Sequence, residues 1–129
     1  MNNELTNTVT AIGNYNSVPT SLTSQAVTVA LVNGLTITKT ADKASWADGP
    51  LTYTITVNNQ AAEAYTAPVV TDVIDTTLVN FVADSVYIDD VKATDAQFKY
   101  DADTHTLTVN LADVAPTSSS VVKFQVTKK

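Results

Sequence analysis

The sequence has no cysteine and no arginine, and it has only one histidine, one methionine and one tryptophan. Without cysteine, the chain cannot form disulfides, thiol nucleophiles or thiolate metal sites. One histidine and one methionine leave almost no side chains for a metal or haem site, so we expect no cofactor. These absences argue against most classes of enzyme, and we expect no small-molecule substrate.

Charge is scarce and mostly of one sign. Seven lysines stand against thirteen acidic residues, which gives a net charge of −6, and no basic block interrupts the chain. Nucleic acids and anionic membranes are bound through clustered positive charge, so we exclude both as partners. No apolar run approaches the roughly 18 residues that span a membrane. The opening MNNELTNTVT lacks the basic start and apolar block of a secretory signal, so we expect either assembly without that export route or a leader that was removed.

Threonine and valine are abundant, with 22 and 18 copies, and they alternate over long stretches. β-Branched residues favour strands, and alternation of apolar with polar residues indicates a strand with one buried face. After residue 34 the pattern predicts strands over residues 35–41, 51–57, 69–74, 78–82, 86–91, 98–100, 104–111 and 121–126. Short strands at this spacing predict an all-β fold, an antiparallel β-sandwich of the immunoglobulin-like kind.

The first 32 residues follow a separate pattern. Residues 5–11 alternate as one strand, and residues 27–31 alternate as a second. Between them, a polar stretch from Gly13 to about Ser24 predicts a loop. We therefore expect an N-terminal arm of two strands in residues 1–32.

The dipeptide Asn33-Gly34 follows this arm. It is a strong hairpin signal, but a two-residue turn here would place Leu31 opposite Thr36. Opposed residues lie on the same face of a sheet, so this pairing would mix an apolar face with a polar one. We interpret the dipeptide as a hinge between the arm, residues 1–32, and a sandwich body, residues 35–129.

Two segments of the body carry a specific pattern, LTITKTADKASWADGPLTYTITVNN and VVTDVIDTTLVNFV. They resemble a family of bacterial surface repeats, domain of unknown function 11, whose pattern joins a TKTAD strand, a D-G-x-L-T-Y-T-I-T-V-x-N strand and a V-x-V-x-D strand. The resemblance covers residues 35–126, and the matching residues are Lys39, Asp48, Gly49, Tyr53, Asn58 and Asp72. The chain departs from the family at Val73-Ile74-Asp75, where the family commonly has Leu-Pro after the aspartate.

The order of the strands also differs from that family. Its repeats typically close with an L-T-N-T-A-T-V segment, whereas this chain stops at Lys129 and carries a similar segment at the front, in residues 5–11. Two arrangements follow. The arm folds back onto its own body as a circularly permuted sandwich, or it completes the sheet of a neighbouring copy by strand addition. The second arrangement is head-to-tail, so it builds a filament of this chain unless it closes into a ring.

Three polar residues fall on apolar faces of the predicted strands. Alternation places Lys39, Asn7 and Asp72 each between apolar residues two positions away. Isolated buried charges are costly, so we expect the three groups to meet if these faces are core. Sandwiches similar to this one often join such a lysine to an asparagine by a spontaneous isopeptide bond. The resemblance implies Lys39 and Asn7 as the crosslinked pair and Asp72 as the catalytic group that assists.

Burial supports this chemistry in general, because it lowers the pKa of an amine and raises that of a carboxylic acid. The bond would be a covalent crosslink that cannot be reduced, and it would stabilise the protein as a disulfide does in other proteins. A plainer interpretation stays open, in which Lys39 reaches water from a strand end, Asn7 lies at a rim and Asp72 caps a turn. Lys43 is the alternative amine for this bond, and Asp48 and Asp75 are the alternative carboxylates.

Other polar motifs predict turns. Asp101-x-Asp103-x-His105 has the opening spacing of a calcium loop but lacks the glycine and glutamate that follow in one, so we expect a turn and no metal. Asp89-Asp90 predicts a hairpin turn in the same way. Trp46 either anchors a ligand or covers the open end of the sandwich.

These patterns predict a structural subunit of a fibre on a cell surface or spore surface. It would assemble head-to-tail by strand complementation and be locked by isopeptide bonds, whose formation is the one catalytic event that we expect. Two alternatives stay open. One is a monomeric adhesin-like or carbohydrate-binding module with its ligand near Trp46, Tyr65 or residues 14–16. The other is a passive spacer repeat of a surface stalk.

Overall fold

The computed structural model describes residues 4–30 and 33–129, and the chain divides into two units, Met1–Asn33 and Gly34–Lys129. The described residues form thirteen strands, and their only helical element is the 3-10 turn η1 (Ala83–Ser85). All strand pairs are antiparallel, so the prediction of an all-β antiparallel sandwich is confirmed. Within residues 4–30 and 33–129, no helix has the length and apolar character needed to cross a membrane.

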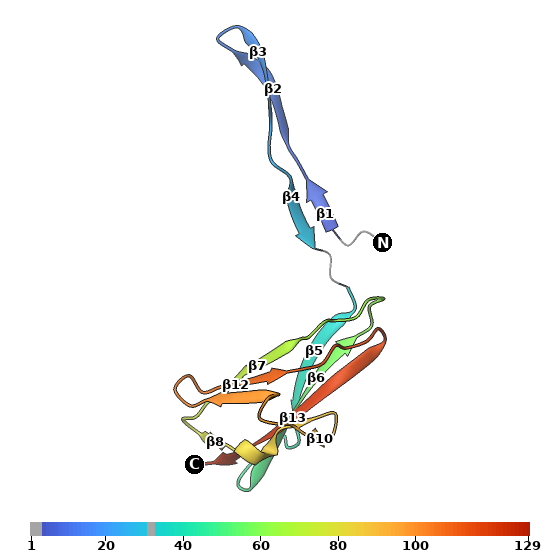
Figure 1. The fold of residues 1–129 in the computed structure, drawn as a ribbon. Coiled ribbons are helices and arrows are strands. Elements are labelled where there is room, and N and C mark those ends of the chain that lie inside the picture. The colour runs from blue at the N-terminus through green and yellow to red at the C-terminus, as the bar shows by residue number, and fades with distance from the viewer. Residues whose placement is uncertain (1–3, 31–32) are drawn as a thin grey trace. The chain divides into compact units, whose positions relative to one another are not determined.

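The N-terminal unit consists of paired strands. β1 (Glu4–Asn7) pairs with β4 (Val27–Ala30), and β2 (Thr10–Tyr15) pairs with β3 (Val18–Thr23) (Figure 1). The loop predicted from Gly13 to Ser24 is therefore wrong, and the expected two strands are four. Asn16 and Ser17 both have positive φ, 49° and 63°, which is the geometry of a two-residue hairpin turn.

The two pairs of strands belong to one continuous ribbon, which we define as residues 4–30. Asn7 is opposite Val27, but Thr10 is opposite Thr23, so the returning segment has one extra residue between these pairs. The backbone N–H of Ser24 donates to Val9 O at 2.8 Å, and that of Val9 donates to Ser24 Oγ at 3.0 Å. These contacts form a β-bulge that carries the ladder past the extra residue.

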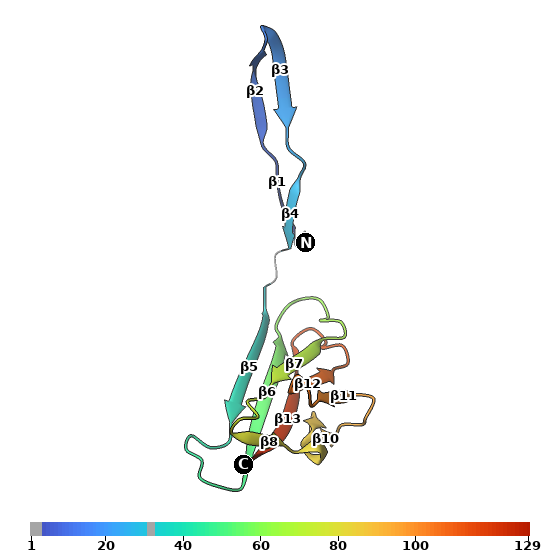
Figure 2. The ribbon, with the colours of Figure 1, turned by 90° about the vertical axis from the view of Figure 1, so that its left-hand side faces the viewer.

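The body is a sandwich of two sheets, whose layers face each other in Figure 2. The larger sheet contains β10 (Val91–Lys92), β9 (Tyr87–Ile88), β13 (Ser118–Lys128), β6 (Pro50–Asn59) and β5 (Leu35–Ala41), in that order, and β8 (Val79–Phe81) also pairs with β13. The smaller sheet contains β11 (Phe98–Asp101), β12 (Thr106–Asn110) and β7 (Val69–Val73).

The core lies between these sheets because alternate residues of each central strand point inward. The buried apolar residues are Leu51, Ile55, Val57, Val70, Ile74, Val86, Ala93, Leu107, Val109, Leu111, Val114, Val122, Phe124 and Val126. Aromatic rings extend this core: Tyr53 lies 5.4 Å from Phe124, and Phe81 lies 4.5 Å from Tyr100, measured between ring centroids. Such tilted aromatic pairs add to the stabilisation from burial alone.

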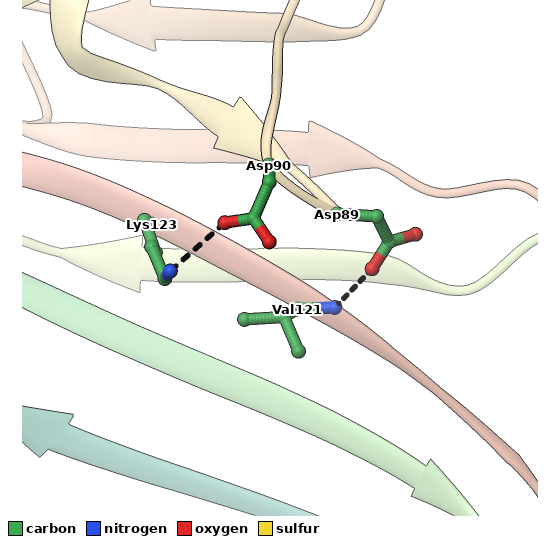
Figure 3. Close-up of polar contacts among 4 residues, drawn as sticks. All are labelled: Asp89, Asp90, Val121 and Lys123. Carbon is green, nitrogen blue, oxygen red and sulfur yellow. Dashed lines mark hydrogen bonds and ion pairs between the residues drawn. The ribbon is translucent and has the colours of Figure 1, made fainter.

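The predicted turn at Asp89-Asp90 joins β9 to β10 and is confirmed by positive φ at both residues, 50° and 65°. Figure 3 shows how the turn is held on β13. Asp89 Oδ1 accepts a hydrogen bond from the backbone N–H of Val121 at 2.8 Å, and Asp90 Oδ1 lies 3.0 Å from Lys123 Nζ. The two carboxylates therefore fix a short hairpin to the central strand of the sandwich.

The body begins at Gly34, which has a φ of 86°. Its carbonyl accepts from the N–H of Gln60 at 2.7 Å, and a Cβ at this position would lie 2.8 Å from the backbone nitrogen of Ala61. Glycine is therefore required both by the backbone angle and by the close approach. Asn33-Gly34 forms no hairpin, because β4 pairs with β1 and β5 pairs with β6.

Candidate docking groove

Two edge strands border one opening of the sandwich. Among the described residues of the body, β5 pairs only with β6 and β7 pairs only with β12. The other edge of each strand has backbone groups without a partner strand in this unit, which makes it a template for another strand.

The face of β5 that points toward the core is uncovered. Ile37 is opposite the buried Val57, and Lys39 is opposite the buried Ile55, so both lie on the inward face. Ile37 nevertheless keeps 64% of its surface exposed, and the Lys39 side chain keeps 42%. The part of the core beneath β5 therefore lacks a covering layer in this unit.

Lys39 and Asp72 meet across this opening. Asp72 is opposite the buried Leu107, which places it on the inward face of β7, and its side chain is only 10% exposed. Lys39 Nζ lies 2.6 Å from Asp72 Oδ2 and 4.4 Å from the centroid of the Tyr53 ring. The ammonium group thus has both an ion pair and a cation–π contact. The ring of Tyr53 is a partner that the sequence analysis did not assign.

Around Lys39 and Asp72 the opening forms a groove of about 410 Å³, and Ile37 lies outside the lining of this groove. Its lining residues are Lys39, Trp46, Leu51, Tyr53, Asp72, Val73, Ile74, Asp75, Leu78, Val79 and Phe124. Trp46 packs partly against the core, and its indole N–H donates to Gly49 O at 3.0 Å. The indole therefore forms part of the wall of the groove, and its N–H already has a hydrogen-bond partner.

Lys43, Asp48 and Asp75, the alternatives to Lys39 and Asp72, lie in other surroundings. Lys43 Nζ donates to the carbonyl of Pro50 at 2.6 Å, and Asp48 lies in the bend before Gly49. Asp75 accepts from the hydroxyl and the backbone N–H of Thr77, and these hydrogen bonds hold its pKa below the ordinary value of 3.8. Of these amines and carboxylates, Lys39 and Asp72 are the two that the structure brings together.

Asn7 belongs to the ribbon, whereas Lys39 and Asp72 belong to the body. It lies on β1 opposite Val27, and it lines a shallow hollow with Leu5, Val9 and Val29. Apart from Thr20, which is half-buried, every side chain from residue 4 to residue 29 is exposed. The ribbon therefore has an apolar face, with Asn7 among its residues, that nothing in its own unit covers.

The acidic motif at the β11–β12 connection is a turn, as predicted. Asp101 Oδ1 accepts from the backbone N–H groups of Thr104 and Asp103, and these bonds lower its pKa below 3.8. His105 has a positive φ of 57° in the same turn. Within the described ranges, no cluster of three or more histidine and acidic residues could hold a metal ion.

Comparisons with protein-family models, with curated proteins and with solved structures found no match. The resemblance of residues 35–126 to bacterial surface repeats therefore stays a prediction. The groove of the body and the apolar face of the ribbon are the features from which a function can be argued.

Proposed function

We propose that this protein is a structural subunit that assembles head-to-tail into a fibre, with the ribbon of one copy filling the groove of the next. Two observations together carry the proposal. The body has an uncovered core face on β5, and the ribbon has an uncovered apolar face. Strand addition satisfies both the backbone groups of the edge and the apolar side chains. A location on a cell surface or spore surface rests on the sequence resemblance alone.

The composition of the ribbon supports its role as the donor. A two-stranded ribbon alone is marginally stable in water, because it has no core of its own. Natural edge strands are commonly protected by charged residues, yet Glu4 is the only charged residue between positions 4 and 30. The ribbon therefore has the properties of a segment that becomes stable by pairing with another chain.

The groove supports its role as the acceptor. A strand placed along β5 would cover Ile37 and exclude water from the Lys39–Asp72 ion pair. A buried ion pair needs further hydrogen bonds to offset its desolvation. On the apolar face of β1, Asn7 is the polar side chain that can supply them. The expected docking therefore places Asn7 of one copy beside Lys39 and Asp72 of the next.

The same arrangement allows a covalent lock. In a water-free groove Lys39 passes a proton to Asp72, and the neutral amine attacks the side-chain carbonyl carbon of Asn7. A new C–N bond forms to Lys39 Nζ, and the bond from that carbon to the Asn7 side-chain nitrogen breaks. The departing nitrogen takes one proton from Lys39 Nζ and leaves as ammonia, which takes up the proton held by Asp72 and departs as ammonium. The carboxylate is thereby restored.

The test of fibre assembly uses the full chain with Val27→Lys, and with Thr28→Lys as the matched control. Both side chains are exposed on β4, but Val27 lies on the apolar face and Thr28 lies on the opposite face, beside Thr6. We expect fibres from the unchanged chain and from Thr28→Lys, and monomers from Val27→Lys, by analytical sedimentation and electron microscopy. A monomeric unchanged chain would overturn the proposal and favour a binding module or a spacer repeat.

The covalent lock has a separate test, in which Lys39→Ala is compared with the unchanged chain on a boiled denaturing gel and by intact mass. We expect a ladder, with the loss of one ammonia per bond, that disappears in Lys39→Ala. A monomer lighter by one ammonia would mean that the arm closes on its own body. Fibres that dissociate fully on boiling, with unchanged mass, would contradict the lock but leave assembly by strand addition in place.

A further inference from the structure

The free edge of β5 offers the backbone groups of its inward-facing residues. The N–H of Asp42, just after β5, donates to Thr52 O at 3.0 Å. The carbonyl of Gly34, just before β5, accepts from the N–H of Gln60 at 2.7 Å. Residues with even numbers therefore direct their backbone groups to β6, because successive residues of a strand direct these groups to opposite edges. The residues with odd numbers, whose side chains face inward, direct theirs to the free edge.

The ribbon has the opposite arrangement in its outgoing segment, which we define as residues 4–15. The N–H of Ser24 donates to Val9 O at 2.8 Å, and the N–H of Val9 donates to Ser24 Oγ at 3.0 Å, so both backbone groups of Val9 point to the returning segment. Tyr15 and Val18 flank the two-residue turn and therefore bond to each other as well. Residues with odd numbers thus direct their backbone groups to the returning segment at two separate points.

This alternation extends to β1. The extra residue of the bulge lies in the returning segment, so the outgoing segment keeps its regular alternation. Asn7 therefore directs its backbone groups to β4. The free edge of β1 offers instead the groups of Thr6 and of its even-numbered neighbours, whose side chains alternate to the face opposite that of Asn7.

The two free edges fit each other in one orientation. In an antiparallel pair, two opposed residues either bond to each other or both direct their backbone groups away. An antiparallel β1 would therefore place Thr6 or Thr8 opposite Lys39, which turns the polar face of the ribbon to the core. In a parallel pair, one of two opposed residues bonds to both neighbours of the other. A parallel β1 therefore bonds along the edge of β5 with both apolar faces inward.

We propose that β1 of one copy adds to β5 of the next copy in the parallel orientation, with Asn7 directly opposite Lys39. The proposal rests on the fibre function above and specifies the strand, the direction and the register of its docking. In this register the backbone N–H of Lys39 donates to Thr6 O, and the carbonyl of Lys39 accepts from the N–H of Thr8. The side chain of Asn7 then lies beside that of Lys39, as the covalent lock requires.

The same register covers the exposed part of the core face. Leu5 lies opposite Ile37, and these side chains are 57% and 64% exposed in their own units. Glu4, the one charged residue of the ribbon, alternates to the outward face and stays in water. The edge of β7 offers less apolar surface to an added strand, because its inward residues Val70 and Ile74 are each only 6% exposed.

The test uses engineered disulfides in the full chain, which has no cysteine of its own. The variant Leu5→Cys with Ile37→Cys places two thiols opposite each other in the proposed register. The matched control, Val9→Cys with Ile37→Cys, would place them opposite each other in an antiparallel pair with the same contact between Asn7 and Lys39. In the parallel register the two thiols of the control are four residues apart along the strands, about 13 Å at roughly 3.3 Å per residue, which is too far for a disulfide.

Both variants are assembled under reducing conditions, checked for fibres by electron microscopy and then oxidised. A thiol reagent counts the free thiols of the denatured samples, so the count does not depend on the covalent lock. We expect Leu5→Cys with Ile37→Cys to lose most of its free thiols, and Val9→Cys with Ile37→Cys to keep them. Because these side chains are exposed in their own units, the substitutions should leave both units folded.

The outcomes separate this inference from the fibre function. Thiol loss in the control alone would overturn the parallel orientation, and equal loss in both variants, or loss in neither, would overturn the register. In each of these cases fibres seen by electron microscopy would still uphold head-to-tail assembly. A chain that stays monomeric but forms the disulfide of Leu5→Cys with Ile37→Cys would overturn the fibre function and uphold the pairing of β1 with β5. A monomeric chain without this disulfide would overturn both proposals.

Discussion

At the scale of single residues, Asn59 is the polar group most deeply built into the body, with no exposed surface. Its Nδ2 donates to the carbonyls of Glu63 and Val114, at 2.8 and 2.9 Å, and its Oδ1 accepts from the N–H of Ala61 at 2.9 Å. A buried amide with all three bonds satisfied fixes the loop after β6 to the segment that connects β12 to β13.

We expect Asn59→Ala to lower the free energy of unfolding by about 3 kcal/mol, because two carbonyls and one N–H would lose their partner. Asn58→Ala, at the neighbouring and more exposed position, should cost less than about 0.5 kcal/mol. Urea unfolding of the dissociated protein measures both values. An equal loss of unfolding free energy in the two variants would contradict a stabilising role for the buried hydrogen bonds of Asn59.

Part of the site at this scale follows from the sequence. Alternation assigns Lys39 and Asp72 to inward faces, and the strand registers give the same faces. Alternation continues from Ile55 and Val57 to Asn59, but the pairing of β6 with β13 is needed to show that the strand extends as far as this residue. The contact of Lys39 with the Tyr53 ring also depends on how neighbouring strands align, which a single strand does not specify.

At the scale of elements, the strands of the body could be predicted from the sequence, but β2 and β3 of the ribbon could not. In the body, one face of each central strand is buried and must be apolar, so the sequences of β6 and β13 alternate between apolar and polar residues. No residue of β2 or β3 is buried, so no core requires these strands to alternate apolar with polar residues. The turn between them depends on positive φ at Asn16 and Ser17, and this pair is a weaker signal than Asn-Gly.

The start of β5 provides a prediction at this scale. Gly34→Ala should destabilise the body by about 2 kcal/mol or more, because the new Cβ would meet the Ala61 backbone at a positive φ. Gly49 also has a positive φ, 74°, but nothing lies within 4 Å of a Cβ there. Gly49→Ala should therefore cost only about 1 kcal/mol. Thermal unfolding of the two variants compares them, and a smaller loss for Gly34→Ala would contradict the steric argument.

At the scale of the whole molecule, charge is divided unequally between the two units. Glu4 is the only charged residue from position 4 to position 30, whereas all seven lysines lie in the body. The contact that we propose between the ribbon and the groove joins surfaces that are apolar, apart from the Lys39–Asp72 pair and Asn7. Long-range attraction between charges therefore contributes little to the expected assembly.

From this distribution we expect assembly to withstand salt. Raising sodium chloride from about 0.05 M to about 1 M shortens the Debye length from more than 10 Å to about 3 Å, so contacts made by surface charges should weaken and apolar contacts should not. The assembled fraction in sedimentation should stay constant or rise. Dissociation at high salt would indicate that surface ion pairs hold the subunits together.

The unequal distribution of lysine has one more consequence, for proteolysis. Trypsin-like enzymes cut after lysine or arginine, and the first such residue in the chain is Lys39, whose amine is engaged with Asp72. The exposed ribbon before it offers these enzymes no cleavage site. In the fibre that we propose, a ribbon that has not yet bound its acceptor would therefore resist trypsin-like proteases, although enzymes that cut after Tyr15 or Leu22 could still remove it.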